Sequence, residues 1–307
     1  MKGLEIANRY FHEWGLPYLR SHHAELVDRL AAGMISGSDS IGADDDISRD
    51  HNWGPGFSLW LTAEDFSAKG AALAADLHGA VPDVFDGFEI VAGFGSKAQS
   101  IRVRSMDEFF MDETSGHREM PASLDRWKPT LRDESHLYFL KHGRVFHDPL
   151  GQFSRRREAF CTWPRPTLLG RIGNTLWQLW HYGEYNFDRV AKRGDRLAVM
   201  LCKAEFIHHA MRLCFYLEED FVPYWKWVAY CFRRLERGGE IADKLDRFNE
   251  ETEIAMQKEL IEGLCATLCA RVIEKGYVSA GQVGGGSPLE IQARLETVRQ
   301  QLQDLSQ

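Results

Sequence analysis

The chain has 307 residues, of which 44% are hydrophobic and 27% are charged. These proportions are typical of globular proteins and the length allows two domains of ordinary size, so a chain that is disordered throughout is excluded. The formal net charge of −8 argues against a dedicated nucleic-acid binder, because such proteins gather Lys and Arg side chains to contact phosphates.

The N-terminus and the cysteines indicate the cellular compartment. Residues 1–5 lack an apolar run and a cleavage signal, and no apolar stretch approaches the roughly 18 residues that a membrane-spanning helix needs. The six cysteines form no Cys-x-x-Cys pair, and all but Cys161 fall in apolar helical patterns, where buried thiols are expected. These features predict a cytoplasmic protein with no membrane segment.

The N-terminal third alternates helices with short strands. We expect a helix over residues 3–31 with a break near Gly15–Pro17, a strand at 34–36, an acidic loop over 39–56, a strand at 57–61, a helix from Thr62 to Leu77, and strands at 88–91 and 100–104 separated by a hairpin turn. Strands that alternate with helices predict a small mixed sheet.

The rest of the chain is helical in pattern. We expect helices at about 106–113, 134–141, 152–162, 166–182, 195–219, 222–237, 240–249, 251–275 and 287–305. The predicted fold class is therefore α+β, with an α/β domain over residues 1–115 and a helical bundle over residues 116–307.

The segment from Gly37 to Leu61 has the residue types that phosphoryl chemistry needs. A tight turn at Gly37–Ser38 exposes backbone N–H groups and a hydroxyl to a phosphate. Asp50 and Asn52 are two residues apart, so on an extended segment both point to one face and reach one Mg²⁺ ion.

This segment resembles the motif of the nucleotidyltransferase superfamily, which has Gly-Ser after the first strand and Asp-x-Asp before the next. More closely, it resembles an uncharacterised bacterial family of nucleotidyltransferase-like proteins catalogued as a domain of unknown function. The resemblance rests on residues 37–42, 45–51, 53–55, 143–148, 212–215 and 224–227. It implies a nucleotidyltransferase-type sheet followed by a helical domain, as in aminoglycoside nucleotidyltransferases.

The resemblance implies a nucleotide partner and a set of site residues. ATP or another nucleoside triphosphate would be the substrate, Mg²⁺ the cofactor, and a small molecule or protein the acceptor of a nucleoside monophosphate. The expected catalytic residues are Asp46 and Asp50, and the expected metal ligands are Asp45, Asp50 and Asn52. The expected nucleotide-binding residues are Gly37, Ser38, Arg49, Arg102, Arg104, Tyr224 and Lys226.

Two departures from the motif leave the activity open. Asn52 replaces a carboxylate, and Arg102 stands where the third carboxylate is expected. Either the acidic run at 44–46 supplies the missing metal ligands, or Arg102 and Arg104 bind a nucleotide phosphate directly and the protein no longer catalyses transfer. A purely structural helical adaptor is the third reading.

Overall fold

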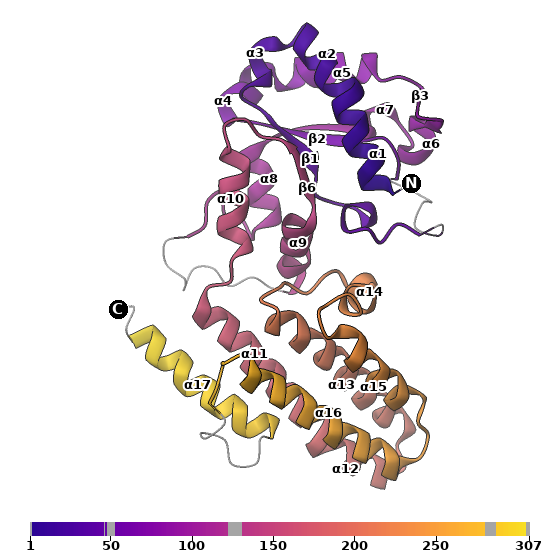
Figure 1. Cartoon of the computed structure of the whole chain (residues 1–307), viewed down its shortest axis with the longest axis vertical. Helices are drawn as coiled ribbons and strands as arrows, with labels where there is room; N and C mark the ends of the chain where they lie inside the picture. The colour runs from indigo at the N-terminus through magenta and orange to yellow at the C-terminus, as the bar shows by residue number, and fades with distance from the viewer. Residues whose placement is uncertain (1, 46, 48–52, 122–130, 280–286, 305–307) are drawn as a thin grey trace. The chain divides into compact units, whose positions relative to one another are not determined.

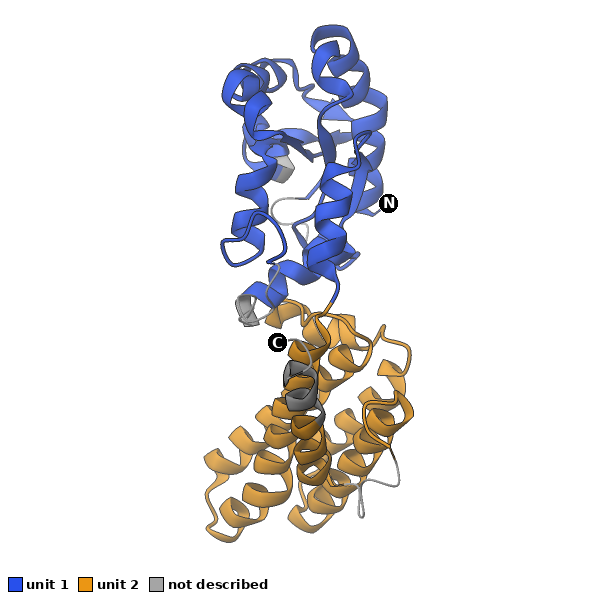
Figure 2. Cartoon of the chain, turned by 90° about the vertical axis from the view of Figure 1, so that its left-hand side faces the viewer, with its two compact units in different colours: residues 1–162 blue, residues 163–307 orange. Residues whose placement is uncertain are grey.

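The computed structural model describes residues 2–45, 47, 53–121, 131–279 and 287–304. The chain divides into two compact units, Met1–Thr162 and Trp163–Gln307 (Figure 2). The division lies later in the chain than the boundary at 115/116 that the sequence suggested. The reason is a strand, β6 (Arg144–His147), which returns to the sheet of unit 1 and pairs with β1 (Ala31–Met34).

Unit 1 contains two sheets, several short helices and segments of π-helix. The remaining strands are β2 (Phe57–Leu61), β3 (Val84–Phe85), β4 (Phe88–Glu89) and β5 (Ile101–Ser105). The helical elements are α1 (Gly3–Tyr10), η1 (Phe11–Gly15), α2 (Leu16–His22), α3 (Ala24–Val27), η2 (Ser38–Ile41), α4 (Ala63–Asp65), η4 (Phe66–Gly70), α5 (Ala71–Ala80), α6 (Ile90–Phe94), α7 (Lys97–Ser100), α8 (Met106–Glu113), α9 (Leu131–His142) and α10 (Gln152–Cys161) (Figure 1).

The larger sheet is four-stranded and mixed. Its strand order is β5-β2-β1-β6, with β2 and β5 parallel and the other two pairs antiparallel. The register places Gly33, Ser58 and Arg102 in one row across β1, β2 and β5. Because alternate residues of a strand face opposite sides, these three residues belong to the same face of the sheet.

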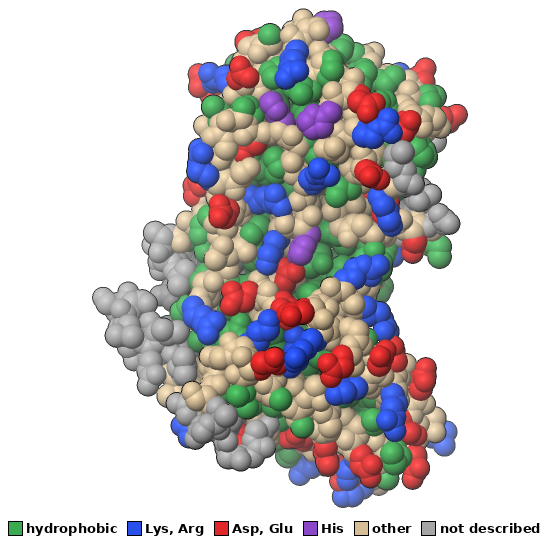
Figure 3. All heavy atoms as spheres, in the orientation of Figure 1, with side chains coloured by type: hydrophobic (Ala, Val, Ile, Leu, Met, Phe, Trp, Pro, Cys, Tyr) green, Lys and Arg blue, Asp and Glu red, His purple; other side chains and the backbone are tan. Residues whose placement is uncertain are grey.

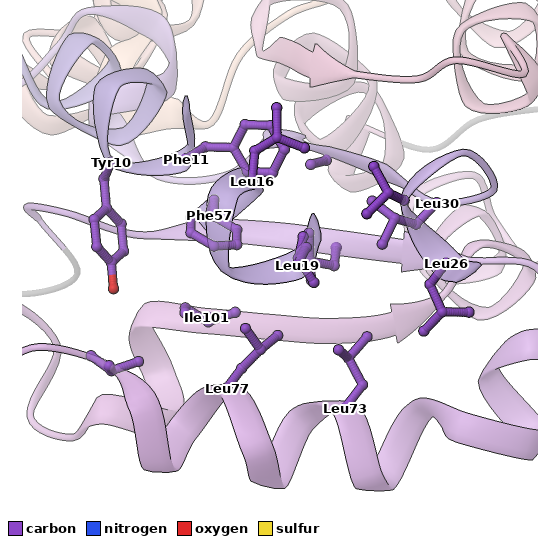
Figure 4. Close-up of a cluster of buried hydrophobic side chains, with 14 of the residues drawn as sticks. Tyr10, Phe11, Leu16, Leu19, Leu26, Leu30, Phe57, Leu73, Leu77 and Ile101 are labelled. Carbon is purple, nitrogen blue, oxygen red and sulfur yellow. The ribbon is translucent and has the colours of Figure 1, made fainter. Parts of the chain in front are cut away.

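One face of this sheet carries the core of unit 1. Figure 4 shows Phe57 of β2 and Ile101 of β5 among side chains from the N-terminal helices and from α5. The buried residues labelled there are Tyr10, Phe11, Leu16, Leu19, Leu26, Leu30, Phe57, Leu73, Leu77 and Ile101. Burying apolar area of this extent is the main stabilising term for a small sheet.

On the opposite face, helices pack against the sheet around Trp60. Trp60 of β2 is 1% exposed, and its ring stacks on Phe153 of α10 with a centroid distance of 4.2 Å. Phe109 of α8 lies against the same ring at 5.0 Å. Three aromatic rings therefore hold α8 and α10 on this face, next to the row that contains Gly33, Ser58 and Arg102.

The N-terminal helix continues where a break was expected. A π-helical turn, η1, precedes Pro17, and the amide of Leu16 bonds to the carbonyl of Phe11, five residues earlier. Pro17 then lies in the first turn of α2, where its missing N–H costs little. The predicted break near Gly15–Pro17 was wrong, because a wider turn absorbs the proline.

Three further predictions for unit 1 need correction. The first strand covers Ala31–Met34 instead of residues 34–36. The expected strand at 88–91 is limited to β4, since the chain turns into α6 at Ile90, so no hairpin turn lies at 93–96. Strand β6 was not predicted. The strands predicted at 57–61 and 100–104 are confirmed within a residue.

Unit 2 is helical in its described part. Its elements are α11 (Arg165–Leu179), η6 (Trp180–Asn186), α12 (Phe187–Lys192), α13 (Arg196–Leu217), η7 (Trp225–Trp227), α14 (Val228–Phe232), α15 (Gly238–Glu250), α16 (Ile254–Glu274) and α17 (Pro288–Asp304). Helix α11 packs against α13 and α17. The expected helix over 222–237 is reduced to η7 and α14. The α+β fold class is confirmed.

The cysteine prediction is also confirmed. Cys202, Cys214, Cys231, Cys265 and Cys269 are buried free thiols, and Cys161 is half-buried. None of the helices in the described part of the chain combines the length and the apolar character needed to cross a membrane.

Candidate functional site

A pocket of about 260 Å³ opens at the end of the sheet where β1 finishes and β2 and β5 begin. The residues that line it are Gly33, Met34, Ile35, Ser36, Gly37, Gly56, Phe57, Ser58, Phe94, Gln99, Ser100 and Arg102. The row of Gly33, Ser58 and Arg102 thus contributes to its wall. Gly33 has no room for a side chain, because a Cβ atom there would lie 2.4 Å from the carbonyl oxygen of Arg144.

The Gly37 turn forms a second part of the wall. Gly37 has a φ angle of +97°, which residues with a side chain rarely adopt, so a glycine is needed at this position. Its carbonyl oxygen accepts hydrogen bonds from the amide and the hydroxyl of Ser40, at 3.2 and 2.8 Å. The turn is therefore held rigidly, with the backbone of Gly37 at the pocket. Ser38, also predicted to bind phosphate, is half-buried and is not one of the lining residues.

Arg102 is the cationic side chain of the pocket lining, and it is exposed. No ion pair joins it to a residue in the described part of the chain. Arg104, two residues later, is engaged: it forms an ion pair with Asp112, and its guanidinium lies 5.6 Å from the ring centroid of Phe109. The structure thus separates the two arginines that the sequence treated together.

Asp39 is a buried carboxyl group directly behind the Gly37 turn. It is 2% exposed, and one of its oxygens, Oδ2, has no hydrogen-bond partner among the described residues. Burial raises the pKa of Asp39 to about 7, despite opposing hydrogen bonds from the amides of Asp39 and Ser40 and the positive charge of Arg102. Burial thus favours the protonated form of this carboxyl group far more than in an exposed aspartate.

Asp44 is a brace for the N-terminus. Its carboxylate accepts hydrogen bonds from the Gly3 amide at 2.7 Å and the Trp53 indole at 3.3 Å, and it pairs with Lys2 at 3.0 Å. Burial alone would raise the pKa of Asp44, but the contacts from Gly3, Lys2 and Trp53 outweigh burial and lower it. Asp44 thus serves to fix the loop to α1.

The other predicted catalytic and metal-binding residues are only partly visible. Asp45 is exposed. Asp46, Arg49, Asp50 and Asn52 lie outside the described residues, so their predicted roles stay predictions. Within the described ranges, no group of three His, Cys, Asp or Glu side chains is arranged to hold a metal ion. The described residues by themselves therefore do not form a Mg²⁺ site.

Tyr224 and Lys226 belong to unit 2, and their predicted role also stays a prediction. Tyr224 is 46% exposed, and the ammonium group of Lys226 lies 5.0 Å from the ring centroid of Trp227. Both residues are at the surface of a short segment that leads from α13 into α14.

Sequence reasoning missed Ser58 and Asp39. Ser58 carried a signal, since it is the single polar residue in the apolar run 57–61 and so marks the face that is not packed in the core. Asp39 carried none, because its burial depends on Gly3 and Trp53, which lie against it only in the folded chain.

Residues 130–228 match a protein family described as a domain of unknown function (DUF4037). The match includes the segments at 143–148, 212–215 and 224–227 that carried the resemblance, but no residue that lines the pocket. No curated protein matches the chain. Among solved structures, the crystal structure of a nucleotidyltransferase-like protein from Exiguobacterium sibiricum is similar at 10% identity, over 85% of this chain and 77% of that chain, with a TM-score of 0.38.

Proposed function

We propose that unit 1 binds a nucleotide, with its phosphates against the Gly37 turn and Arg102. The observation that carries this proposal is the exposed Arg102 guanidinium beside a glycine turn in a pocket of about 260 Å³. Arg102 has no carboxylate partner among the described residues, and a guanidinium is well suited to phosphate because its fork of N–H donors matches two phosphate oxygens. The resemblance of the Gly37–Ser38 segment to nucleotidyltransferases supports the same ligand class.

The first test is calorimetric titration of the full chain with ATP, GTP, CTP and UTP, in chelator and in Mg²⁺. Arg102→Ala is expected to weaken binding by about ten- to a hundredfold, the loss expected for a hydrogen bond to a charged group. Arg104→Ala is the matched control, because its guanidinium already pairs with Asp112. Equal affinity of the wild type and Arg102→Ala, or no binding of any nucleotide, would contradict the proposal.

We propose further that the bound nucleoside triphosphate is a substrate. An acceptor hydroxyl on a small molecule or a protein gives up its proton and bonds to the α-phosphate, so that the nucleoside monophosphate is transferred and pyrophosphate leaves. The observation in favour is the acidic run that follows the Gly37 turn, in which Asp45 is exposed. By the resemblance, Asp45, Asp50 and Asn52 would hold Mg²⁺, with Asp46 and Asp50 as the catalytic carboxylates. Bound Mg²⁺ would neutralise phosphate charge.

The second test is incubation with α-labelled nucleotides and Mg²⁺ or Mn²⁺ across hydroxylated small molecules and proteins. Label is expected on the acceptor, and Asp50→Ala is expected to lower the rate at least a hundredfold while nucleotide binding in chelator is retained. Absence of transfer to every acceptor, with binding intact, would instead favour a nucleotide-binding protein that does not catalyse transfer.

A further inference from the structure

The segment 224–237 of unit 2 differs in charge from the chain as a whole. It contains four cationic residues, Lys226, Arg233, Arg234 and Arg237, and one acidic residue, Glu236, within a protein of net charge −8. On the face of the molecule in Figure 3, acidic and basic side chains are interspersed. The excess of positive charge in residues 224–237 is therefore local to this segment and does not follow from the charge of the chain as a whole.

Four side chains of this segment form a continuous row that we call the aromatic–basic row. It consists of Lys226, Trp227, Tyr230 and Arg234. The Lys226 ammonium lies 5.0 Å from the ring centroid of Trp227, that ring lies 5.8 Å from the ring of Tyr230, and the Arg234 guanidinium lies 3.4 Å from the Tyr230 centroid. The row therefore has a cation at each end and two aromatic rings between them.

The cations of the row are available to a ligand, whereas their neighbours are not. Arg233 forms two contacts of 2.8 Å with Asp246, and Arg237 pairs with Glu274 at 2.6 Å. Lys226 and Arg234 are both exposed, and neither pairs with a carboxylate in the described part of the chain. The row thus carries two positive charges that no carboxylate among the described residues neutralises.

Exposed rings flank the row. Trp225 is 73% exposed and Tyr224 is 46% exposed, with ring centroids 5.6 Å apart. Leaving a Trp ring in water forfeits a large apolar surface, so its exposure needs an explanation other than stability. Planar rings next to unneutralised cations are the combination that single-stranded nucleic acids use, because bases stack on rings and phosphates meet the cations.

We propose that the aromatic–basic row, with Tyr224 and Trp225, binds a single-stranded nucleic acid. The partner is a short single strand, which contacts Lys226 and Arg234 through phosphates and Trp225 through a base. The proposal departs from the expectation drawn from the net charge, because that expectation concerned the whole chain and the row is a local site. It uses residues of unit 2 alone and is independent of the nucleotide pocket.

The experiment is fluorescence anisotropy of labelled single-stranded RNA and DNA oligonucleotides with the full chain, at several salt concentrations. With two phosphate contacts, the logarithm of the binding constant is expected to fall with the logarithm of salt concentration with a slope of about −1.4, since each contact to a single strand contributes about −0.7. Lys226→Ala/Arg234→Ala is expected to bring that slope close to zero. Trp225→Ala is expected to weaken binding about tenfold without a change in slope.

Matched controls separate the row from general surface effects. Arg233→Ala removes a cation that Asp246 already neutralises, and Trp177→Ala removes a ring that is 37% exposed elsewhere in unit 2. Both are expected to bind as the wild type does. Comparing the affinities for RNA and DNA oligonucleotides shows which of the two nucleic acids is preferred. The proposal would be overturned if the double variant and Trp225→Ala bound oligonucleotides as the wild type does. It would also be overturned if the control variants lost as much affinity, or if only Arg102→Ala lost affinity. Concentration-dependent dimerisation that Trp225→Ala abolishes, without oligonucleotide binding, would also overturn it.

Discussion

Replacing Trp60 with Ala is expected to destabilise unit 1 by about 3–5 kcal/mol, the usual cost of truncating a large buried ring. Trp60 is 1% exposed and contacts Phe109 and Phe153, so its removal leaves a cavity between the sheet and two helices. Because α8 and α10 pack on the sheet through this ring, amides of β1, β2 and β5 should lose protection together. Hydrogen exchange of these strands reports the free energy of opening of unit 1 alone.

Two control variants make the Trp60 result interpretable. Trp60→Phe keeps a ring in the stack, and the Trp60 indole N–H has no hydrogen-bond partner among the described residues, so we expect a cost of only about 1 kcal/mol. Trp225→Ala removes a ring that is 73% exposed and should change stability by less than about 0.5 kcal/mol. Similar protection of the strands in Trp60→Ala and wild type would refute the role assigned to the ring.

Asp39→Asn is expected to stabilise the protein by about 2–4 kcal/mol at pH 8 and to have little effect at pH 4. Burial raises the pKa of Asp39 from an ordinary 3.8 to about 7. Between these values the unfolded chain is ionised while the folded chain holds the proton, so folding becomes less favourable as the pH rises. Above pH 7 the folded protein bears the full free-energy cost of burying an ionised carboxylate. A neutral amide at this position avoids that cost.

Asp44→Asn supplies the opposite pH dependence in the same loop. Its carboxylate has a lowered pKa, so the stabilisation from Gly3, Lys2 and Trp53 is present at neutral pH and is lost as the pH falls. Urea unfolding at pH 4, 6 and 8 distinguishes the two variants. A stability difference between Asp39→Asn and wild type that did not grow from pH 4 to pH 8 would show that Asp39 is not buried as described.

The elements that sequence reasoning found are those with strong local patterns. Helix α13 is rich in apolar residues over a long stretch without Gly or Pro, and β2 and β5 carry apolar or β-branched residues. Strand β1 was displaced because Ala31, Ala32 and Gly33 have little strand propensity, and only their burial between β2 and β6 makes them a strand. Strand β6 carries Arg144 and His147 at its ends and gave no alternation to detect.

Only those residues of the candidate site that belong to local sequence motifs were predicted. Gly37 and Arg102 were named from local motifs, and the register of β1, β2 and β5 brings both to one pocket. Arg104 was named by its proximity to Arg102, but its partner Asp112 lies on a helix whose position no local pattern reveals. The burial of Asp39 likewise depends on tertiary contacts with α1.

The return of β6 to the sheet sets an order for folding during synthesis. Until residues 144–147 leave the ribosome, β1 has a partner on one side only and its outer backbone groups are open to pairing with other chains. A nascent polypeptide ending near residue 115 therefore has an incomplete sheet with an unpaired edge strand that is prone to aggregation. Translational pausing in the stretch between β5 and β6 should raise misassembly, and continuous elongation through His147 should suppress it.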